Sequence, residues 1–133
     1  MLNSVVAVLA GYIVLAVIVM LGTALAVRAI LRQLPSALRA PAPGYLTTAY
    51  LAANLAASAL AAVAAGFVTA AIAGHARLSH GLALAGVMVV LSLLSMQQAG
   101  ASEPRWYQLV LATVMPAIAV GGAFLCGALA RVA

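Results

Sequence analysis

Residues 50–73 read YLAANLAASALAAVAAGFVTAAIA, and no charged side chain occurs among them. A helix needs about 20 mostly apolar residues to cross the hydrocarbon core of a bilayer, and this stretch is long enough. Alanine dominates it: thirteen alanines lie between Tyr45 and Ala73. Because alanine favours insertion into lipid much less than leucine or isoleucine does, we predict a membrane-spanning helix that other helices enclose.

The rest of the chain is also strongly apolar. Of its 133 residues, 68% are hydrophobic and only 5% are charged, whereas a soluble domain carries about 25% charged residues. So few charges cannot cover a surface that faces water, which predicts an integral membrane protein. The net charge of +5 comes from six basic residues at loops and helix ends and one acidic residue. We therefore expect no nucleic-acid partner.

Four apolar runs are long enough to cross a membrane or nearly so: residues 4–27, 45–73, 81–96 and 106–130. Short polar segments with proline and glycine separate them. The pattern predicts an all-α fold, a multi-pass four-transmembrane-helix bundle that forms a single membrane domain over residues 1–133. We interpret the first run as a retained helix, because no basic residue precedes it and it exceeds the apolar core of a typical signal peptide.

Several residues at the ends of the runs indicate the membrane surface. Trp106 and Tyr107 fall at the beginning of the fourth run, where aromatic side chains anchor helices at the interface. Arg28, Arg32 and Arg39 follow the first run. Juxtamembrane basic residues attract anionic lipid headgroups, so we expect membrane lipids as partners of these side chains.

The distribution of arginine also gives an orientation. The loops at residues 28–44 and 97–105 hold four of the six basic residues. Because cytoplasmic loops carry an excess of arginine and lysine, this favours these two loops in the cytoplasm and both termini on the other side.

Polar side chains in the second run form the first candidate site. Steps of four residues place Tyr50, Asn54 and Ser58 on one ridge of the helix, and a neighbouring line of small residues leads to Thr69. One interpretation is helix packing, in which Asn54 bonds to another helix with a gain of about 0.6–2 kcal/mol. The other is a weakly polar ligand site or pathway, since polar groups within a membrane often serve function.

The fourth run contains a candidate hinge. Pro116 removes a backbone donor in the middle of the run, and Gly121 and Gly122 follow about one turn later. The functional interpretation is a flexible point. The alternative is a static kink whose free carbonyl is satisfied by Thr113 or by a neighbouring helix.

Groups suited to catalysis are scarce. No Asp, Glu, Lys or Arg lies inside any run, and Glu103, His75 and His80 all occur in loops. The two histidines are five residues apart, so they would not share a helix face as two metal ligands do. Cys126 is predicted to be a small buried hydrophobe. We therefore expect no catalytic residues, no metal, no cofactor and no enzymatic activity.

The layout resembles a loose group of uncharacterised four-helix proteins of the bacterial inner membrane. The resemblance rests on GYIVLAVIVMLGTALA in the first run, the alanine-rich second run, and PRWYQLVLATVMPAIAVGG in the fourth. It implies the fold and a bacterial inner-membrane location, but no activity. Small multidrug resistance transporters have a similar size, yet they use a glutamate within the first helix, and this chain has none there. The Gly-rich and Phe-containing motifs of the small fluoride channels are not recognisable either.

Two hypotheses for function follow. The first is a non-enzymatic structural or accessory protein, which packs through small-residue helix faces as a homo-oligomer or as a subunit of a larger membrane complex. The alternative is a small-solute or ion channel or facilitator, with a weakly polar pathway along the second helix and Pro116 as its flexible point.

Overall fold

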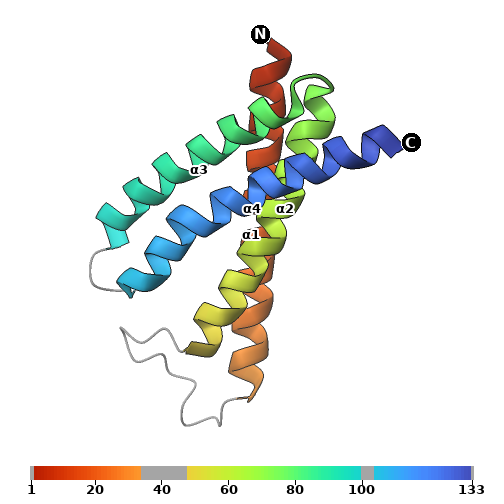
Figure 1. Ribbon diagram of the computed structural model, residues 1–133. Helices are drawn as coiled ribbons and strands as arrows, with labels where there is room; N and C mark the ends of the chain where they lie inside the picture. The colour runs from red at the N-terminus through yellow and green to blue at the C-terminus, as the bar shows by residue number, and fades with distance from the viewer. Residues whose placement is uncertain (1, 34–47, 100–103, 133) are drawn as a thin grey trace.

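Four helices account for nearly all of the chain that the structure describes. The computed structural model describes residues 2–33, 48–99 and 104–132, in the order α1 (Leu2–Gln33), α2 (Thr48–Ala73), α3 (Arg77–Ala99) and α4 (Arg105–Val132) (Figure 1). All four are long and apolar enough to cross a membrane. The predicted all-α bundle of four apolar helices is confirmed.

Three of the four helices, α1, α3 and α4, extend beyond the apolar runs that predicted them. α1 continues past Val27 through Arg28 and Arg32, and α3 begins at Arg77, four residues before the predicted start at Gly81. Polar residues can continue a helix after it leaves the hydrocarbon core, so hydropathy marks the apolar part of a helix and not its ends. Residues 45–47, at the predicted start of the second run, lie outside the described residues.

The turn between α2 and α3 is shorter than the predicted loop over residues 74–80. Gly74 and Ala76 have φ angles of 66° and 48°, in the left-handed region. Two such residues reverse the chain within three positions, and the Ala76 carbonyl already accepts the His80 amide at 3.2 Å. His80 therefore lies in the first turn of α3, which corrects the prediction that both histidines lie in a loop.

α2 is the central element of the bundle. Both α2 and α3 contact each of the other helices, but the two most extensive helix contacts are those of α2 with α1 and with α4. Within the described residues, the backbones of α1 and α4 do not approach each other closely. Figure 1 shows α3 and α4 as an antiparallel pair that lies obliquely across α1 and α2. We predicted that other helices enclose the second run, and α4 is enclosed to the same extent. In the most apolar stretch of each of these two helices 39% of the residues are buried, against 11% in α1.

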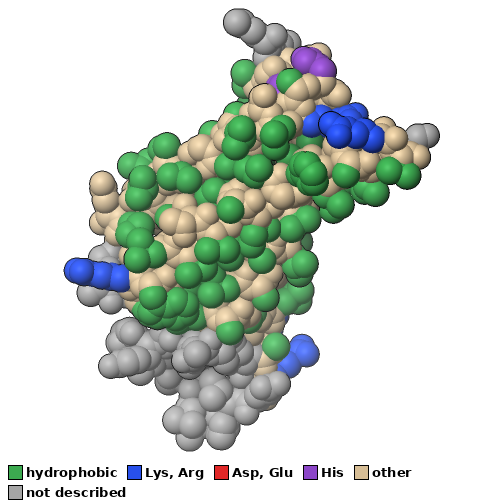
Figure 2. All heavy atoms as spheres, in the orientation of Figure 1, with side chains coloured by type: hydrophobic (Ala, Val, Ile, Leu, Met, Phe, Trp, Pro, Cys, Tyr) green, Lys and Arg blue, Asp and Glu red, His purple; other side chains and the backbone are tan. Residues whose placement is uncertain are grey.

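The topology places the helix ends as a four-span protein requires. The beginning of α1, the end of α4 and the α2–α3 turn lie at one end of the molecule, and the end of α1 and the beginning of α4 lie at the opposite end (Figure 1). Apolar side chains cover the middle of the face seen in Figure 2, and basic side chains lie towards its margins. This distribution is typical of a surface that meets lipid in its middle and headgroups at its ends.

Glycine permits the closest helix approach, between α2 and α4. A Cβ added at Gly66 would collide with the carbonyl oxygen of Ala119, and one added at Gly122 would collide with the carbonyl group of Val63. The two glycines are reciprocal, because each receives the backbone of the opposite helix. Small residues allow this approach in lipid, where helices associate through packing and not through a hydrophobic driving force.

Glycine also permits the close contact of α1 with α2. A Cβ at Gly11 would lie 2.9 Å from the Ala65 carbonyl oxygen and would collide with the Thr69 hydroxyl. A Cβ at Gly22 would lie 2.6 Å from the Cβ of Ala57. Gly11 and Gly22, which share one face of the first run, thus both face α2.

We predict that a single methyl group at the α2–α4 crossing weakens the bundle. Gly122→Ala should lower the free energy of unfolding by about 1–3 kcal/mol, because overpacking forces the backbones apart. Gly86→Ala is the matched control, since a Cβ there meets nothing within 4 Å. Titration with a denaturing detergent in mixed micelles measures both. Equal stability of the two variants would show that the crossing is not closely packed.

Candidate functional site

Asn54 is the centre of a hydrogen-bond cluster that joins three helices. Its Nδ2 donates to the Thr23 hydroxyl on α1 at 2.7 Å. Its Oδ1 accepts the Tyr107 hydroxyl of α4 at 2.7 Å and, more weakly, the Ser58 hydroxyl at 3.3 Å. Asn54 is only 9% exposed, so these bonds lie inside the bundle.

Most hydrogen-bonding positions of the Asn54 amide are occupied in the cluster. An amide side chain has two N–H donors and an oxygen that accepts two bonds, and three of these four positions are filled. A buried polar group without partners is costly in lipid, so each bond offsets a desolvation cost. The bonds to Thr23 and Tyr107 also tie α2 to α1 and to α4. This arrangement fits a packing role for Asn54, and the choice between packing and a pathway along the ridge stays a prediction.

Tyr107 differs from the prediction that it contacts headgroups beside Trp106. Its side chain is 4% exposed and points to Asn54, whereas Trp106 is 52% exposed. Neighbouring residues on a helix point about 100° apart, so Trp106 can face outward while Tyr107 faces the packed side of α4. The rings still meet edge to face, with centroids 6.0 Å apart.

The other members of the ridge have different surroundings. Tyr50 is half-buried, whereas Ser58 is buried at 6% exposure. Thr69 is fully buried where Gly11 of α1 approaches α2, and its hydroxyl has no hydrogen-bond partner. Thr69 therefore belongs to the α1–α2 contact, and it is not part of the Asn54 cluster.

The candidate hinge lies in an unbroken helix. α4 runs from Arg105 to Val132 through Pro116, which is buried. Gly122 is held against Val63, whereas Gly121 faces outward with nothing near its Cβ position. The Thr113 hydroxyl bonds to the Leu109 carbonyl at 2.7 Å, and not to the Ala112 carbonyl whose usual donor Pro116 removes. Whether Pro116 acts as a hinge stays a prediction.

Beside the Asn54 cluster lies a crevice of about 300 Å³ that receives side chains from all four helices. α1 contributes Tyr12, α2 contributes Asn54 and Ser58, and α3 contributes Ser92 and Ser95. The remaining lining residues are Leu15, Val19, Met88, Leu91, Leu111 and Met115. The lining carries hydroxyl and amide groups but no charge, so it suits water or a small neutral molecule.

Gln108 extends this polar region towards the beginning of α4. It is 6% exposed, and its Nε2 has no hydrogen-bond partner. It lines a cavity of about 60 Å³ together with Ser92 and Ser95, which also line the crevice. A cavity of this size can hold a water molecule, which needs about 10–15 Å³ and polar partners. A buried unpaired donor is the feature most suggestive of a ligand here.

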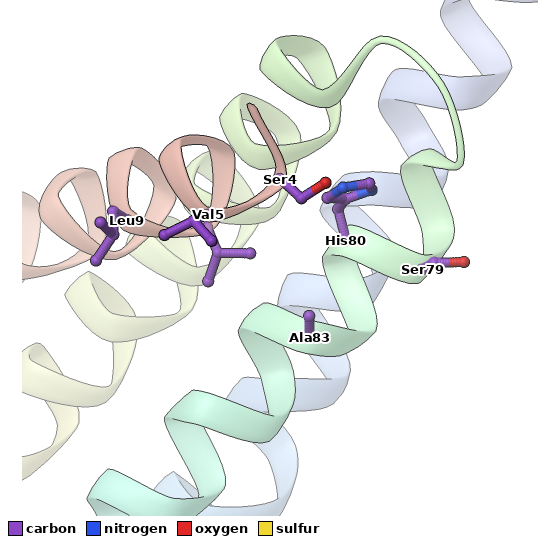
Figure 3. Close-up of a pocket in the computed structure, with 7 residues that line it drawn as sticks. Ser4, Val5, Leu9, Ser79, His80 and Ala83 are labelled. Carbon is purple, nitrogen blue, oxygen red and sulfur yellow. The ribbon is translucent and has the colours of Figure 1, made fainter. Parts of the chain in front are cut away.

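The two histidines come together although their spacing puts them on different helix faces. Their ring centroids are 6.0 Å apart and nearly perpendicular, because His75 lies in the turn and His80 in the helix. Figure 3 shows His80 beside Ser4 across a groove between the beginnings of α1 and α3, which has a volume of about 410 Å³. Within the described residues, no three potential ligands gather to hold a metal ion.

The predicted headgroup contacts can be placed in part. Arg28 and Arg32 are exposed near the end of α1, and Arg39 lies outside the described residues. Thr23, Tyr107 and Gln108 contribute to the polar interior of the bundle, a role that the sequence did not predict for any of them. Their only sequence signal is a polar side chain inside or next to an apolar run.

No protein-family model, curated protein or solved structure matches the chain.

We predict that the bond between Asn54 and Tyr107 couples α2 to α4. In a double-mutant cycle with Asn54→Ala and Tyr107→Phe, the coupling free energy should be about 0.5–2 kcal/mol, as for hydrogen bonds between membrane helices. Unfolding in mixed micelles gives the four values. Thr113→Val serves as the control for each single variant, because its exposed hydroxyl bonds only within α4. A coupling near zero would contradict the packing role of Asn54.

Proposed function

We propose that this chain is a non-enzymatic protein of the bacterial inner membrane that acts as a structural or accessory subunit. In this proposal it assembles through small-residue helix faces, with copies of itself or within a larger membrane complex. The Asn54 cluster inside the bundle supports this proposal. Its polar atoms are engaged in bonds between helices, which suits a stable scaffold better than a reactive centre.

The observation that carries the proposal is an outward face of α4 with small side chains like those at the helix crossings inside the bundle. Thr113, Ala117 and Gly121 are four residues apart and all exposed. Gly121 adjoins Gly122, which receives the backbone of α2. An outward line of small side chains gives a second helix the same opportunity for close approach, because small-xxx-small faces drive helix association in membranes.

We predict that a bulky residue on this face disrupts assembly. Gly121→Ile should weaken self-association or partner binding about 5- to 150-fold, the range that corresponds to 1–3 kcal/mol of steric overlap. Native mass spectrometry of protein extracted gently from its own membrane measures the species present. Gly86→Ile is the control, since it adds the same bulk at an outward glycine of α3.

The outcomes of that experiment separate the forms of the proposal. A homo-oligomer that Gly121→Ile dissociates supports self-assembly, and a fixed-stoichiometry complex with other subunits supports an accessory role. A wild-type chain that is monomeric and free of partners at all concentrations contradicts the proposal.

A second candidate function is a facilitator of a small neutral solute, and the uncharged crevice with Gln108 favours it. Its lining of hydroxyl and amide groups could replace part of the hydration of a small molecule. The absence of a charged side chain from the lining fits a neutral solute better than an ion, because an ion in a low-dielectric site needs compensating charge or many dipoles.

Water access to the crevice tests this candidate. In a Cys126→Ala background, Ser92→Cys should react with a polar maleimide at least tenfold faster than Leu93→Cys. Thiolates form only where water reaches, and Leu93 is exposed outside the crevice at nearly the same depth. Equal, slow labelling of both variants would exclude a water-filled pathway.

A further inference from the structure

A recess that is distinct from the crevice lies where α3 begins and α4 ends. It has a volume of about 380 Å³ and opens beside the α2–α3 turn. Arg77 at the first position of α3 and Arg131 in the last turn of α4 both line it. Figure 2 shows basic side chains gathered near this end of α4. Residues 54 apart in sequence thus bring two positive charges to one recess.

The Arg77 guanidinium is incompletely satisfied. Arg77 is half-buried, and its Nε is enclosed without a hydrogen-bond partner. The chain has one acidic side chain, Glu103, which lies outside the described residues, so no described carboxylate side chain can neutralise either arginine. Guanidinium groups remain charged and present planar donors that match phosphate oxygens.

The backbone of the recess adds to its affinity for an anion. Gly74 and Ala76 line it in left-handed conformations and lead directly into α3. Ala76 has no polar side chain to cap the helix, and the first-turn residues Leu78 and Ser79 also line the recess. Unsatisfied amides and the helix dipole at such a start favour negative charge. This contribution is secondary to the two arginines.

The other wall of the recess is apolar and faces outward. Phe124 is 68% exposed and Leu78 is 49% exposed, and both line the recess. The polar part lies at the end of the apolar spans, where lipid headgroups sit. A ligand that fits has an anionic head for the arginines and an apolar body that can lie along Phe124.

We propose that this recess is a binding site for a phosphodiester anion, supplied by the headgroup of an anionic phospholipid. Basic pockets between transmembrane helices bind phosphate headgroups by the same chemistry. Arg77 donates from within the recess and Arg131 closes it from the end of α4. The site is independent of the assembly proposed above, because none of its lining residues belongs to the outward face of Thr113, Ala117 and Gly121.

Native mass spectrometry with added lipid tests the proposal. The full-length protein in neutral detergent is titrated with phosphatidylglycerol and, separately, with phosphatidylcholine. The first lipid should bind at least tenfold more tightly. The double variant Arg77→Gln/Arg131→Gln should lose about 25-fold in affinity for phosphatidylglycerol, since each basic side chain is worth about fivefold near an anionic surface. Arg77→Lys/Arg131→Lys, which keeps both charges, should lose less.

The matched control is Arg28→Gln/Arg105→Gln, which removes two exposed arginines at the opposite end of the molecule. This control variant should still bind its tightest-bound phosphatidylglycerol molecule as the wild type does. Competition with glycerol phosphate distinguishes the two sources of the anion. Displacement of the lipid at low millimolar concentration would indicate that free phosphate compounds also occupy the site, and no displacement would indicate a lipid site. Equal losses in the two glutamine double variants, or no preference for phosphatidylglycerol, would overturn the proposal.

Discussion

The crossing of α2 and α4 at Gly66 and Gly122 is the contact on which the rest of the bundle depends. Each glycine receives a backbone carbonyl of the opposite helix, so the distance between the two helices is set by main-chain atoms. Tyr107 and Asn54 meet across the same pair of helices, and their 2.7 Å bond requires that close approach. With α1 held against α2 by Gly11 and Gly22, the two contacts place polar atoms from three helices within bonding reach.

This geometry explains why a helix so rich in alanine is stable in a membrane. Alanine gains little from lipid, and glycine costs helix stability in water. In the bundle both residue types allow backbone contact, and the bulky side chains of α1 and α3 cover the outside. Stability then comes from close packing and from a few internal hydrogen bonds, which are the forces available to helices in lipid.

The polar features of the molecule divide into two regions with different chemistry. The uncharged crevice by Asn54 and Gln108 lies among the helices and offers only hydroxyl and amide groups. The recess by Arg77 and Arg131 lies at one end of the bundle and offers positive charge. Because charge is tolerated at the membrane surface and is costly within the bilayer, this separation follows from the membrane itself. In the proposals above, the first region serves assembly or passage of a solute, and the second binds a lipid headgroup.

The sequence by itself determined that the chain suits a lipid bilayer and not water. It also determined the number of spans and their approximate limits. All of these depend on hydropathy and length, which are local properties. It also placed Asn54 and Ser58 on one ridge of the second helix, since helical periodicity is local as well. Only the tertiary structure decided that Thr23 and Tyr107 bond to Asn54, and that Arg77 and Arg131 share one recess. Those pairs depend on the tilt and crossing of helices that are distant in sequence, and small side chains permit many crossings without specifying one. Tyr107 illustrates the limit: its position next to Trp106 predicted the membrane surface, and the rotation of α4 against α2 turned it inward.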